Sequence, residues 1–331
     1  MRALLSVEPG DGTTLRIGEA DCPSPAPGEV RVRTCFAGIN YPDVLIIEDR
    51  YQVRPPRPFA PGIEVAGYVE AVGAGVESVK IGQACVALLR YGGLAEYAVA
   101  PAGAVAALPP GTDLATAAST IVSYGTSWHG LHDRAGLHEG DILIVLGASG
   151  VVGLAAVEIG KALGARVIAG VSSEPKAKAA RARGADDVVV YPSQQVDGRA
   201  LAELFKAACG PGGATCVFDP VGGAYGEAAL RALAWQGRYL VVGFAAALPT
   251  LAANVILLKS ADVSGVTWGE TVARTPGLFQ RHMTEIGALA ASGRIKPGPA
   301  TVVPLEAAGD AIQSLAQRAA VGKIVVRISA D

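Results

Sequence analysis

The sequence predicts an α/β protein of two domains, in which a β domain precedes a doubly wound sheet of parallel strands. Three observations support this prediction. Residues 1 to about 120 are rich in proline, glycine and short β-type runs. From residue 142 onward, apolar strands alternate with longer stretches that suit helices, as in a parallel sheet. A glycine-rich turn follows the first of these strands.

The first domain is expected to consist of short strands with frequent turns, as in a small barrel. A hairpin is predicted between residues 2–7 and 14–18, with Gly10, Asp11 and Gly12 at its turn. Four further β-type runs cover residues 29–33, 64–72, 84–88 and 94–99, and together they predict an all-β domain. Residues 322–327 form another strand, which we expect to return to this domain because the second sheet is complete before it.

The second domain begins with five apolar residues, 142–146, which run without alternation, as in a strand buried on both faces. Gly147, Gly150 and Gly153 follow, and then a proline-free helical stretch from about 151 to 163. This context indicates a dinucleotide-binding turn, although Ala148 replaces the first glycine of the usual pattern. Such a turn lets the backbone approach a pyrophosphate, toward which the helix N-terminus directs free N–H groups. A plain tight turn is the alternative.

The next strand, residues 166–171, ends in hydroxyls rather than in an acidic residue. In an NAD-binding unit, a carboxylate at this tip bonds the ribose 2′-OH. Here Ser172, Ser173 and Lys176 suit a 2′-phosphate, which a carboxylate would repel, and Glu174 lies beyond the tip. We therefore predict NADP rather than NAD. The alternative is that the two serines only cap the next helix.

The alternation of strands and helices continues to residue 266. Strands are predicted at 187–191, 214–219, 237–243 and 262–266, and helices near 176–183, 200–208 and 225–235. Ligands bind such sheets at the carboxyl ends of the strands. The predicted cofactor contacts along this edge are Ser149, Gly150, Val151, Val152, Ser172, Ser173, Lys176, Tyr191, Val221, Gly243 and Phe244.

The composition favours a large core and a small-molecule ligand. Half of the 331 residues are apolar, and the formal net charge of −2 gives no electrostatic argument for nucleic acid or a membrane surface. Neither a signal segment nor a membrane span is recognisable, so we expect a cytoplasmic protein. The five cysteines form no CxxC pair, and we expect buried, reduced thiols.

Several motifs in one order resemble the medium-chain dehydrogenase/reductase superfamily, and within it the zinc-free NADPH:quinone oxidoreductase branch. The resemblance covers the whole chain and rests on AGINYPDV (37–44), YQ (51–52), PGIEVAGYV (61–69), YGTS (124–127) and residues 147–153, 172–176 and 241–245. It implies a GroES-like β-barrel catalytic domain of residues 1–122 and 265–331, and a Rossmann NADP-binding domain of residues 123–264. It also implies NADPH as the hydride donor and assembly as dimers or tetramers, of which we expect a homodimer.

Zinc-dependent members of the superfamily carry a catalytic cysteine, a Gly-His-Glu motif, a further cysteine and a four-cysteine lobe. This chain departs from that pattern. Asn40 stands at the position of the first cysteine, and Ile63 replaces the histidine and leaves Glu64 without a thiol or imidazole beside it in the sequence. Residues 88–94 are too short and contain no cysteine for a structural lobe.

The histidines do not complete a zinc site in the sequence pattern. We expect no thiol or carboxylate at metal-ligand spacing from any of the three candidates, His129, His132 and His138. They are more simply explained as packing or surface residues. We therefore predict no zinc, and polarisation of the substrate by hydrogen bonds instead.

Two residues are candidates for the catalytic contacts beside the nicotinamide, which supplies the hydride. Asn40 is predicted to make a polar contact with the substrate and the cofactor; its alternative is a turn residue before Tyr41 and Pro42. Tyr51 resembles the tyrosine that related enoyl-thioester reductases place near the substrate as a proton donor, a role that an ordinary tyrosine pKa suits. Its alternative is an aromatic wall of the pocket.

The resemblance adds five further cofactor contacts. Tyr124 and Thr126 correspond to positions that contact the nicotinamide in relatives, although Thr126 could instead cap a following helix. Val266 and Trp268 are expected near the nicotinamide, and Trp268 also beside the substrate. Lys323 is expected to reach the cofactor from the C-terminal strand, unless it belongs only to a turn with Gly322.

The leading interpretation is an NADPH:quinone oxidoreductase, with one-electron and two-electron reduction both open. The alternative is an enoyl reductase acting on a 2-enal or a 2-enoyl-CoA thioester, with hydride to Cβ and a proton to Cα from Tyr51. The three arginines of residues 50–57 would then meet the CoA phosphates, whereas a solvated loop is the simpler explanation. A third hypothesis is a non-catalytic NADPH-binding protein, because fold alone does not define function.

Overall fold

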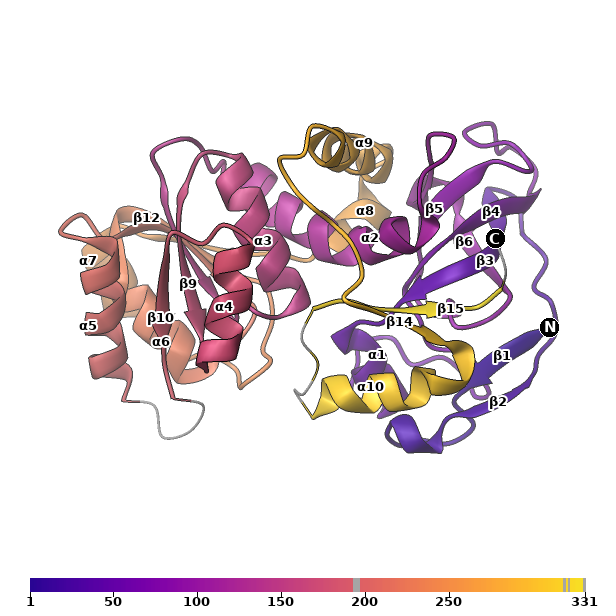
Figure 1. Cartoon of the computed structure of the whole chain (residues 1–331), viewed down its shortest axis with the longest axis horizontal. Helices are drawn as coiled ribbons and strands as arrows, with labels where there is room; N and C mark the ends of the chain where they lie inside the picture. The colour runs from indigo at the N-terminus through magenta and orange to yellow at the C-terminus, as the bar shows by residue number, and fades with distance from the viewer. Residues whose placement is uncertain (193–196, 318–319, 321, 330–331) are drawn as a thin grey trace. The chain divides into compact units, whose positions relative to one another are not determined.

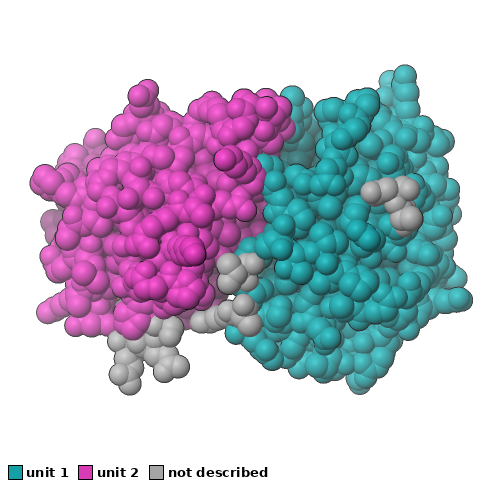
Figure 2. Space-filling view, viewed as in Figure 1, with its two compact units in different colours: residues 1–122, 269–285, 297–331 teal, residues 123–268, 286–296 magenta. Residues whose placement is uncertain are grey.

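The computed structural model describes residues 1–192, 197–317, 320 and 322–329. The chain divides into two compact units, coloured separately in Figure 2. Unit 1 consists of residues 1–122, 269–285 and 297–331, and unit 2 of residues 123–268 and 286–296.

Unit 2 is built on a six-stranded parallel sheet of order β10-β9-β8-β11-β12-β13. Strands β9, β10 and β12 of this sheet are labelled in Figure 1. Its strands are β8 (Ile142–Leu146), β9 (Arg166–Val171), β10 (Asp187–Val190), β11 (Ala214–Asp219), β12 (Leu233–Val241) and β13 (Asp262–Gly265). The residues of β8, β9 and β11 are almost all buried, because helices cover both faces of a doubly wound sheet. The predicted parallel sheet is therefore confirmed.

Five helices connect these strands in turn: α3 (Val151–Ala162), α4 (Glu174–Ala182), α5 (Gly198–Cys209), α6 (Gly223–Ala232) and α7 (Ala253–Lys259). Helix α3 packs against α4, and α5 packs against α6 (Figure 1). The chain proceeds outward from β8 to β10 and then returns to β11 beside β8. The strand order thus reverses between β8 and β11, and this switch point is where such sheets bind ligands.

One error in the predicted elements of unit 2 concerns the start of β12. The sequence suggests a helix as far as residue 235, whereas α6 ends at Ala232 and β12 begins at Leu233. Leu233 pairs with Ala214 of β11. This contact between residues far apart in sequence outweighs local helix propensity, which is a weak determinant.

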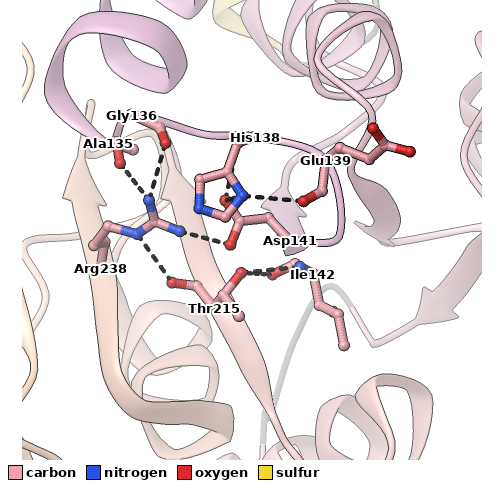
Figure 3. Close-up of polar contacts among 8 residues, drawn as sticks. All are labelled: Ala135, Gly136, His138, Glu139, Asp141, Ile142, Thr215 and Arg238. Carbon is pink, nitrogen blue, oxygen red and sulfur yellow. Dashed lines mark hydrogen bonds and ion pairs between the residues drawn. The ribbon is translucent and has the colours of Figure 1, made fainter.

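A polar cluster around Arg238 ties together the amino ends of β8 and β11 (Figure 3). The guanidinium forms an ion pair with Asp141 at 2.7 Å, and it also donates to the backbone carbonyls of Ala135, Gly136 and Thr215. Burial acts to raise the pKa of Asp141, but hydrogen bonds from its neighbours and the charge of Arg238 hold it below its usual value. The π-helical segment His129–Arg134, which precedes Ala135, is thereby joined to the sheet.

Unit 1 contains a seven-stranded sheet of order β14-β15-β3-β4-β5-β7, with β6 also paired to β3. Its strands are β3 (Glu29–Gly38), β4 (Glu64–Val72), β5 (Ala84–Leu88), β6 (Tyr97–Pro101), β7 (Val105–Ala107), β14 (Thr301–Pro304) and β15 (Ile324–Arg327). Strand β15 pairs antiparallel with β3, so the predicted return of the C-terminal strand to the first domain is confirmed. Strands β1 (Arg2–Leu5) and β2 (Arg16–Glu19) form a separate antiparallel pair, joined through a short 3₁₀ turn, Gly12–Thr14, rather than a tight hairpin.

The prediction that this domain is all-β is wrong. Unit 1 contains α1 (Tyr41–Ile47), α10 (Ala308–Ala316), the first part of α2 (Leu114–Trp128), most of α8 (Trp268–Arg274) and part of α9 (Leu278–Ala291). Helices α1 and α10 pack together, and Ile46, Ile47 and Ile312 enter the same core as the sheet. The missed signal for α1 is the sequence of its first turn, in which Asn40 is the N-cap and Asp43 accepts from the Asn40 N–H.

All five cysteines are free thiols, and four of them are buried as predicted. Cys22 is the exception, because it is exposed in the segment before β3. Within the described residues, no helix is both long and apolar enough to cross a bilayer.

Candidate active site

The turn between β8 and α3 has a backbone that only glycine can adopt. Gly147 has a φ of +57°, and a Cβ at Gly153 would lie 2.3 Å from the Gly147 carbonyl oxygen. Gly150 is the N-cap of α3. The N–H groups of Val151 and Val152 in its first turn therefore have no acceptor within the helix. With the helix dipole, they offer a site for an anionic group at the carboxyl end of β8.

A second turn, between β11 and α6, is held in shape by a buried carboxylate. Asp219 is 1% exposed and accepts from the backbone N–H groups of Val221 and Gly222, both at 2.8 Å. Its other oxygen accepts from the Tyr239 hydroxyl, and burial raises its pKa. A Cβ on Gly147 would lie 2.8 Å from the Val221 side chain. The predicted contact Val221 thus lies at the switch point, and Asp219 is a residue that the sequence analysis missed.

The tip of β9 brings two hydroxyls and an ammonium together. Ser173 is the N-cap of α4, yet its side chain makes no capping bond, and the Lys176 ammonium donates to the Ser172 hydroxyl at 3.1 Å. Glu174 is exposed and faces Arg181 at 3.6 Å. The side chains at the tip of β9 therefore carry a positive charge, which suits binding of a 2′-phosphate.

The hydroxyl of Tyr191, a predicted cofactor contact, is hydrogen-bonded to the glycine turn. That hydroxyl donates to the Gly170 carbonyl at 3.2 Å and accepts from the Gly147 N–H at 3.4 Å. The ring lies against Tyr225 with centroids 4.7 Å apart. Burial raises the pKa of Tyr191, so the hydroxyl keeps its proton. Its contact with a cofactor stays a prediction.

The hydroxyl of Tyr124 is also engaged inside unit 2. It donates to Glu158 at 2.5 Å, and the same carboxylate pairs with Arg183 at 2.8 Å. Burial, and then the negative charge of Glu158, raise the pKa of Tyr124. Thr126 lies within α2 near its end, so the alternative that it caps a following helix is wrong. Contacts of Tyr124 and Thr126 with the nicotinamide stay predictions.

The remaining predicted contacts of unit 2 follow β12 and β13. Gly243 and Phe244 lie in the segment after β12, which ends at Val241, and Phe244 is 49% exposed. Val266 is buried after β13, with its N–H donating to the Val241 carbonyl. Trp268 is buried against Gly125 of α2, where a Cβ would lie 2.2 Å from the indole ring. Its ring therefore fills space that α2 leaves open.

In unit 1, four polar side chains meet in the interior, each of them at most 5% exposed: Asn40, Asp43, Glu64 and Lys323. The Asn40 amide nitrogen donates to Glu64 at 2.7 Å. The Lys323 ammonium donates to the Asn40 side-chain oxygen at 2.7 Å and to the Ile39 carbonyl at 2.9 Å. It also forms an ion pair with Glu64. The sequence pattern indicated Asn40 and Lys323 separately, but it did not indicate that they are in contact.

Asp43 completes this cluster from the first turn of α1. It accepts from the N–H groups of Asn40 at 2.7 Å and of Gly62 at 2.9 Å. Burial raises its pKa to about 7, in spite of these two bonds. Asp43 was not predicted as a site residue, although an acidic residue three positions after an Asn N-cap is a known helix signal.

Tyr51 lies half-buried beside this cluster and packs against the core of unit 1. Burial raises its pKa, and the negative charges of Asp43 and then Glu270 act in the same direction. The hydroxyl is therefore held in its protonated form. It is suited to donate a proton and not to accept one.

The cluster does not suit a zinc ion. Zinc takes three or four nitrogen, sulfur or oxygen ligands. Here one oxygen of Asn40 and one of Glu64 already contact the Lys323 ammonium, and the other Glu64 oxygen accepts from the Val122 N–H at 2.7 Å. Among the described residues, no trio of histidine, cysteine or carboxylate side chains that includes Glu64 has its ligand atoms within 4.8 Å.

The expectation that no carboxylate lies near the histidines of unit 2 is wrong. Asp133 contacts the Nδ1 atoms of His129 and His132 at 3.0 and 2.9 Å. The His132 ring also stacks on Trp128. His129 and Asp133 are four positions apart on a helical segment, a spacing that brings two side chains to one face, so the sequence carried this signal.

The arginine-rich segment of residues 50–57 does not act as one group. Arg57 is bound within unit 1, to Asp49 at 2.9 Å and to the Ile47 carbonyl at 2.9 Å. Arg50 and Arg54 are exposed, and Arg50 pairs with Glu48. At most two arginines therefore remain for an anionic substrate.

Comparisons with known proteins agree with this fold. Residues 26–110 match the alcohol dehydrogenase GroES-like domain, and residues 151–284 match the zinc-binding dehydrogenase family. The quinone oxidoreductase-like protein 2 of Bos taurus is 35% identical over 304 residues, which cover 91% of this chain and 86% of that protein.

Two solved structures are similar along nearly the whole chain. A mycobacterial protein complexed with NADPH has a TM-score of 0.91 at 29% identity, over 99% of this chain and 100% of that chain. The Escherichia coli quinone oxidoreductase complexed with NADPH has a TM-score of 0.89 at 27% identity, with the same coverage. The chain belongs to the medium-chain dehydrogenase/reductase family, and within it to the quinone oxidoreductase branch.

Proposed function

We propose that this protein is a zinc-independent, NADPH-dependent oxidoreductase that transfers hydride to a quinone. The observation that carries the proposal is that unit 2 contains both a glycine turn at the switch point and, at the tip of β9, a lysine ammonium beside two serine hydroxyls. The first site suits a pyrophosphate and the second a 2′-phosphate. The NADPH complexes of two similar proteins support the same choice of cofactor.

The chain's own residues would bind the cofactor and handle the proton, while the nicotinamide supplies the hydride. Val151 and Val152 would hold the pyrophosphate by their N–H groups, and Lys176 would neutralise the 2′-phosphate. Asn40 would contact the ligands from the buried cluster of unit 1, in which it is hydrogen-bonded to Lys323 and Glu64. Tyr51, protonated at neutral pH, would donate the proton.

The deciding experiment measures NADPH oxidation with a simple quinone and with crotonyl-CoA at equal enzyme concentration. Turnover of the quinone, with little turnover of crotonyl-CoA, supports the proposal. Faster turnover of crotonyl-CoA would show an enoyl reductase instead. Tight NADPH binding without oxidation by quinones, enals or enoyl-CoA would show a non-catalytic NADPH-binding protein.

The enoyl reductase remains the second candidate because of Tyr51. Reduction of an enoyl thioester places a proton on Cα, so the reaction needs a donor that is protonated at the working pH and more acidic than the carbon acid that forms. Burial and the charge of Asp43 keep the Tyr51 hydroxyl protonated. A quinone can instead take its protons from water, so this feature favours the second candidate specifically.

We further propose that the protein is a homodimer that forms through the β13 edge of unit 2. Helix α7 contains no buried residue, and Leu257 and Leu258 are 78% and 73% exposed. Trp235 of β12 and Val263 of β13 are also exposed. Among the described strands, β13 pairs only with β12. A second copy could cover both the apolar face and the strand edge by a symmetric contact.

Sedimentation of charged variants tests the homodimer. Leu257→Asp combined with Leu258→Asp should give a monomer at micromolar concentration, because two buried charges oppose the contact. Leu204→Asp on α5, where the wild-type leucine is 51% exposed, is the control and should leave a dimer. A wild-type protein that sediments as a monomer, or a doubly charged variant that sediments as a dimer, would contradict the proposed surface.

A further inference from the structure

Lys323 is held entirely inside unit 1. It is 5% exposed, and its ammonium has three N–H donors. These reach three acceptors, namely the Ile39 carbonyl, the Asn40 side-chain oxygen and the Glu64 carboxylate. No donor is left over for a phosphate or a ribose.

The two charged partners determine which way the Asn40 amide faces. An ammonium can only donate a hydrogen bond, and a carboxylate can only accept one. The oxygen of Asn40 must therefore face Lys323, and its nitrogen must face Glu64. The second N–H of the amide donates to the Gly38 carbonyl at 3.3 Å. Both donors of Asn40 are thus used within the chain.

The side chain of Asn40 has one hydrogen-bonding position left for a ligand, a lone pair on its oxygen. The side-chain oxygen can accept two hydrogen bonds, and among the described residues only Lys323 donates to it. A ligand that contacts this side chain must therefore offer a donor, such as a hydroxyl or an amide N–H. Asn40 cannot donate to a quinone carbonyl while the cluster is intact.

We propose that Lys323 and Glu64 are positioning residues that lock Asn40 as a hydrogen-bond acceptor for a ligand hydroxyl or amide. The role of this orientation in catalysis rests on the proposed function. The orientation of the Asn40 amide by Lys323 and Glu64 does not. The buried Glu64 carboxylate makes the lock possible, since a charge in the interior must be paired and this one holds Lys323 in place.

Selective labelling tests the lock without any assay of activity. The chain contains two asparagines, Asn40 and Asn254, so ¹⁵N-asparagine labelling gives two pairs of side-chain amide signals, and an Asn254→Gln variant assigns them. The Asn40 amide protons should exchange with solvent at least about tenfold more slowly than in the denatured chain, because both are hydrogen-bonded and buried. Exchange at the denatured rate would overturn the inference.

A double substitution separates positioning from stability. Lys323→Met should lower the melting temperature by about 10 °C, because Glu64 is left buried and unpaired. Adding Glu64→Gln removes that charge and should restore most of the stability. It should not restore quinone reduction, and kcat/KM should stay at least about tenfold below wild type, because Asn40 is then free to turn. The control Lys161→Met, which breaks the half-exposed pair with Asp186, should change neither quantity appreciably.

Each outcome of this cycle has a definite meaning. Recovery of both stability and kcat/KM in the double variant would show that the pair serves stability alone, and would overturn the inference. A double variant that stays as unstable as Lys323→Met would show that the two charges are not coupled, and would also overturn it. A wild-type protein that reduces no acceptor would refute the proposed function. The amide exchange rate would still test whether Lys323 and Glu64 hold Asn40 in one orientation.

Discussion

Tyr51 is the residue whose chemistry separates the two candidate reactions. Its raised pKa keeps the hydroxyl protonated, so Tyr51→Phe removes a proton donor and little else. We expect a loss of about a hundredfold in rate for an enone or enoyl-CoA, as general acid catalysis is typically worth, and a loss of less than about threefold for a quinone. Steady-state rates with both substrates measure this difference. Tyr91→Phe, which changes an exposed tyrosine, is the control; equal small losses with both substrates would remove Tyr51 from the chemistry.

Lys176 is the residue on which the choice of NADPH depends. Its ammonium lies 3.1 Å from the Ser172 hydroxyl at the tip of β9. Lys176→Ala should weaken NADPH binding by about tenfold or more, since a charge-assisted hydrogen bond is lost, and leave NADH binding nearly unchanged. Titration of cofactor fluorescence measures both constants. Lys178→Ala, on the exposed side of the same helix, should change neither, and equal losses for both cofactors in Lys176→Ala would show that the lysine is structural.

At the scale of elements, the turn from β8 to α3 is where sequence and fold agree most closely. Gly153 sits against the Gly147 carbonyl, where a Cβ would lie 2.3 Å away. Gly153→Ala should therefore destabilise the protein by about 2 kcal/mol, as overpacking typically does, and weaken NADPH binding. Urea unfolding and cofactor titration check the two effects. Gly212→Ala, where nothing lies within 4 Å, is the matched control, and an unchanged Gly153→Ala protein would refute this reading of the turn.

The elements that were predicted wrongly from local sequence patterns are those that depend on contacts between residues far apart in the chain. Strand β12 begins at Leu233 because that residue pairs with Ala214, although its own segment suits a helix. Helix α1 is seven residues long and is supported by α10 from near the chain's end. Isolated helices of this length are unstable in water, so its own sequence carries only a weak signal.

At the scale of the whole molecule, Asp43 makes stability depend on pH. Its pKa is raised from 3.8 to about 7 in the folded protein, first by burial and also by the charge of Glu64, while Lys323 opposes the shift. Between these values the folded protein binds the extra proton, so its contribution to stability falls as pH rises. Between pH of about 4 and about 7, the free energy of unfolding of the wild type should therefore fall by about 4 kcal/mol relative to that of Asp43→Asn.

Urea unfolding at a series of pH values measures this difference. Asp21→Asn, which replaces an exposed carboxylate, is the control and should run parallel to the wild type. The prediction fails if the wild-type and Asp43→Asn curves also run parallel. In that case the pKa of Asp43 in the folded protein would not differ from its value in the unfolded chain.

The sequence by itself determined the α/β class, the parallel sheet of unit 2 and the glycine turn at its switch point. These follow from patterns that span one strand, one turn and one helix, so the residues that decide them are neighbours in the chain. The two hydroxyls and the lysine at the tip of β9 are also determined locally, since they lie within five consecutive positions.

Only the tertiary structure decided what surrounds the candidate catalytic residues. Lys323 reaches Asn40 across 283 positions of sequence, and Glu64 becomes a partner because β4 and β15 both pair with β3. Burial then raises the pKa of Asp43 and Tyr51. No local pattern encodes these effects, because hydrogen-bond partners, charge pairing and desolvation depend on which strands meet, and strand pairing is settled over the whole sheet.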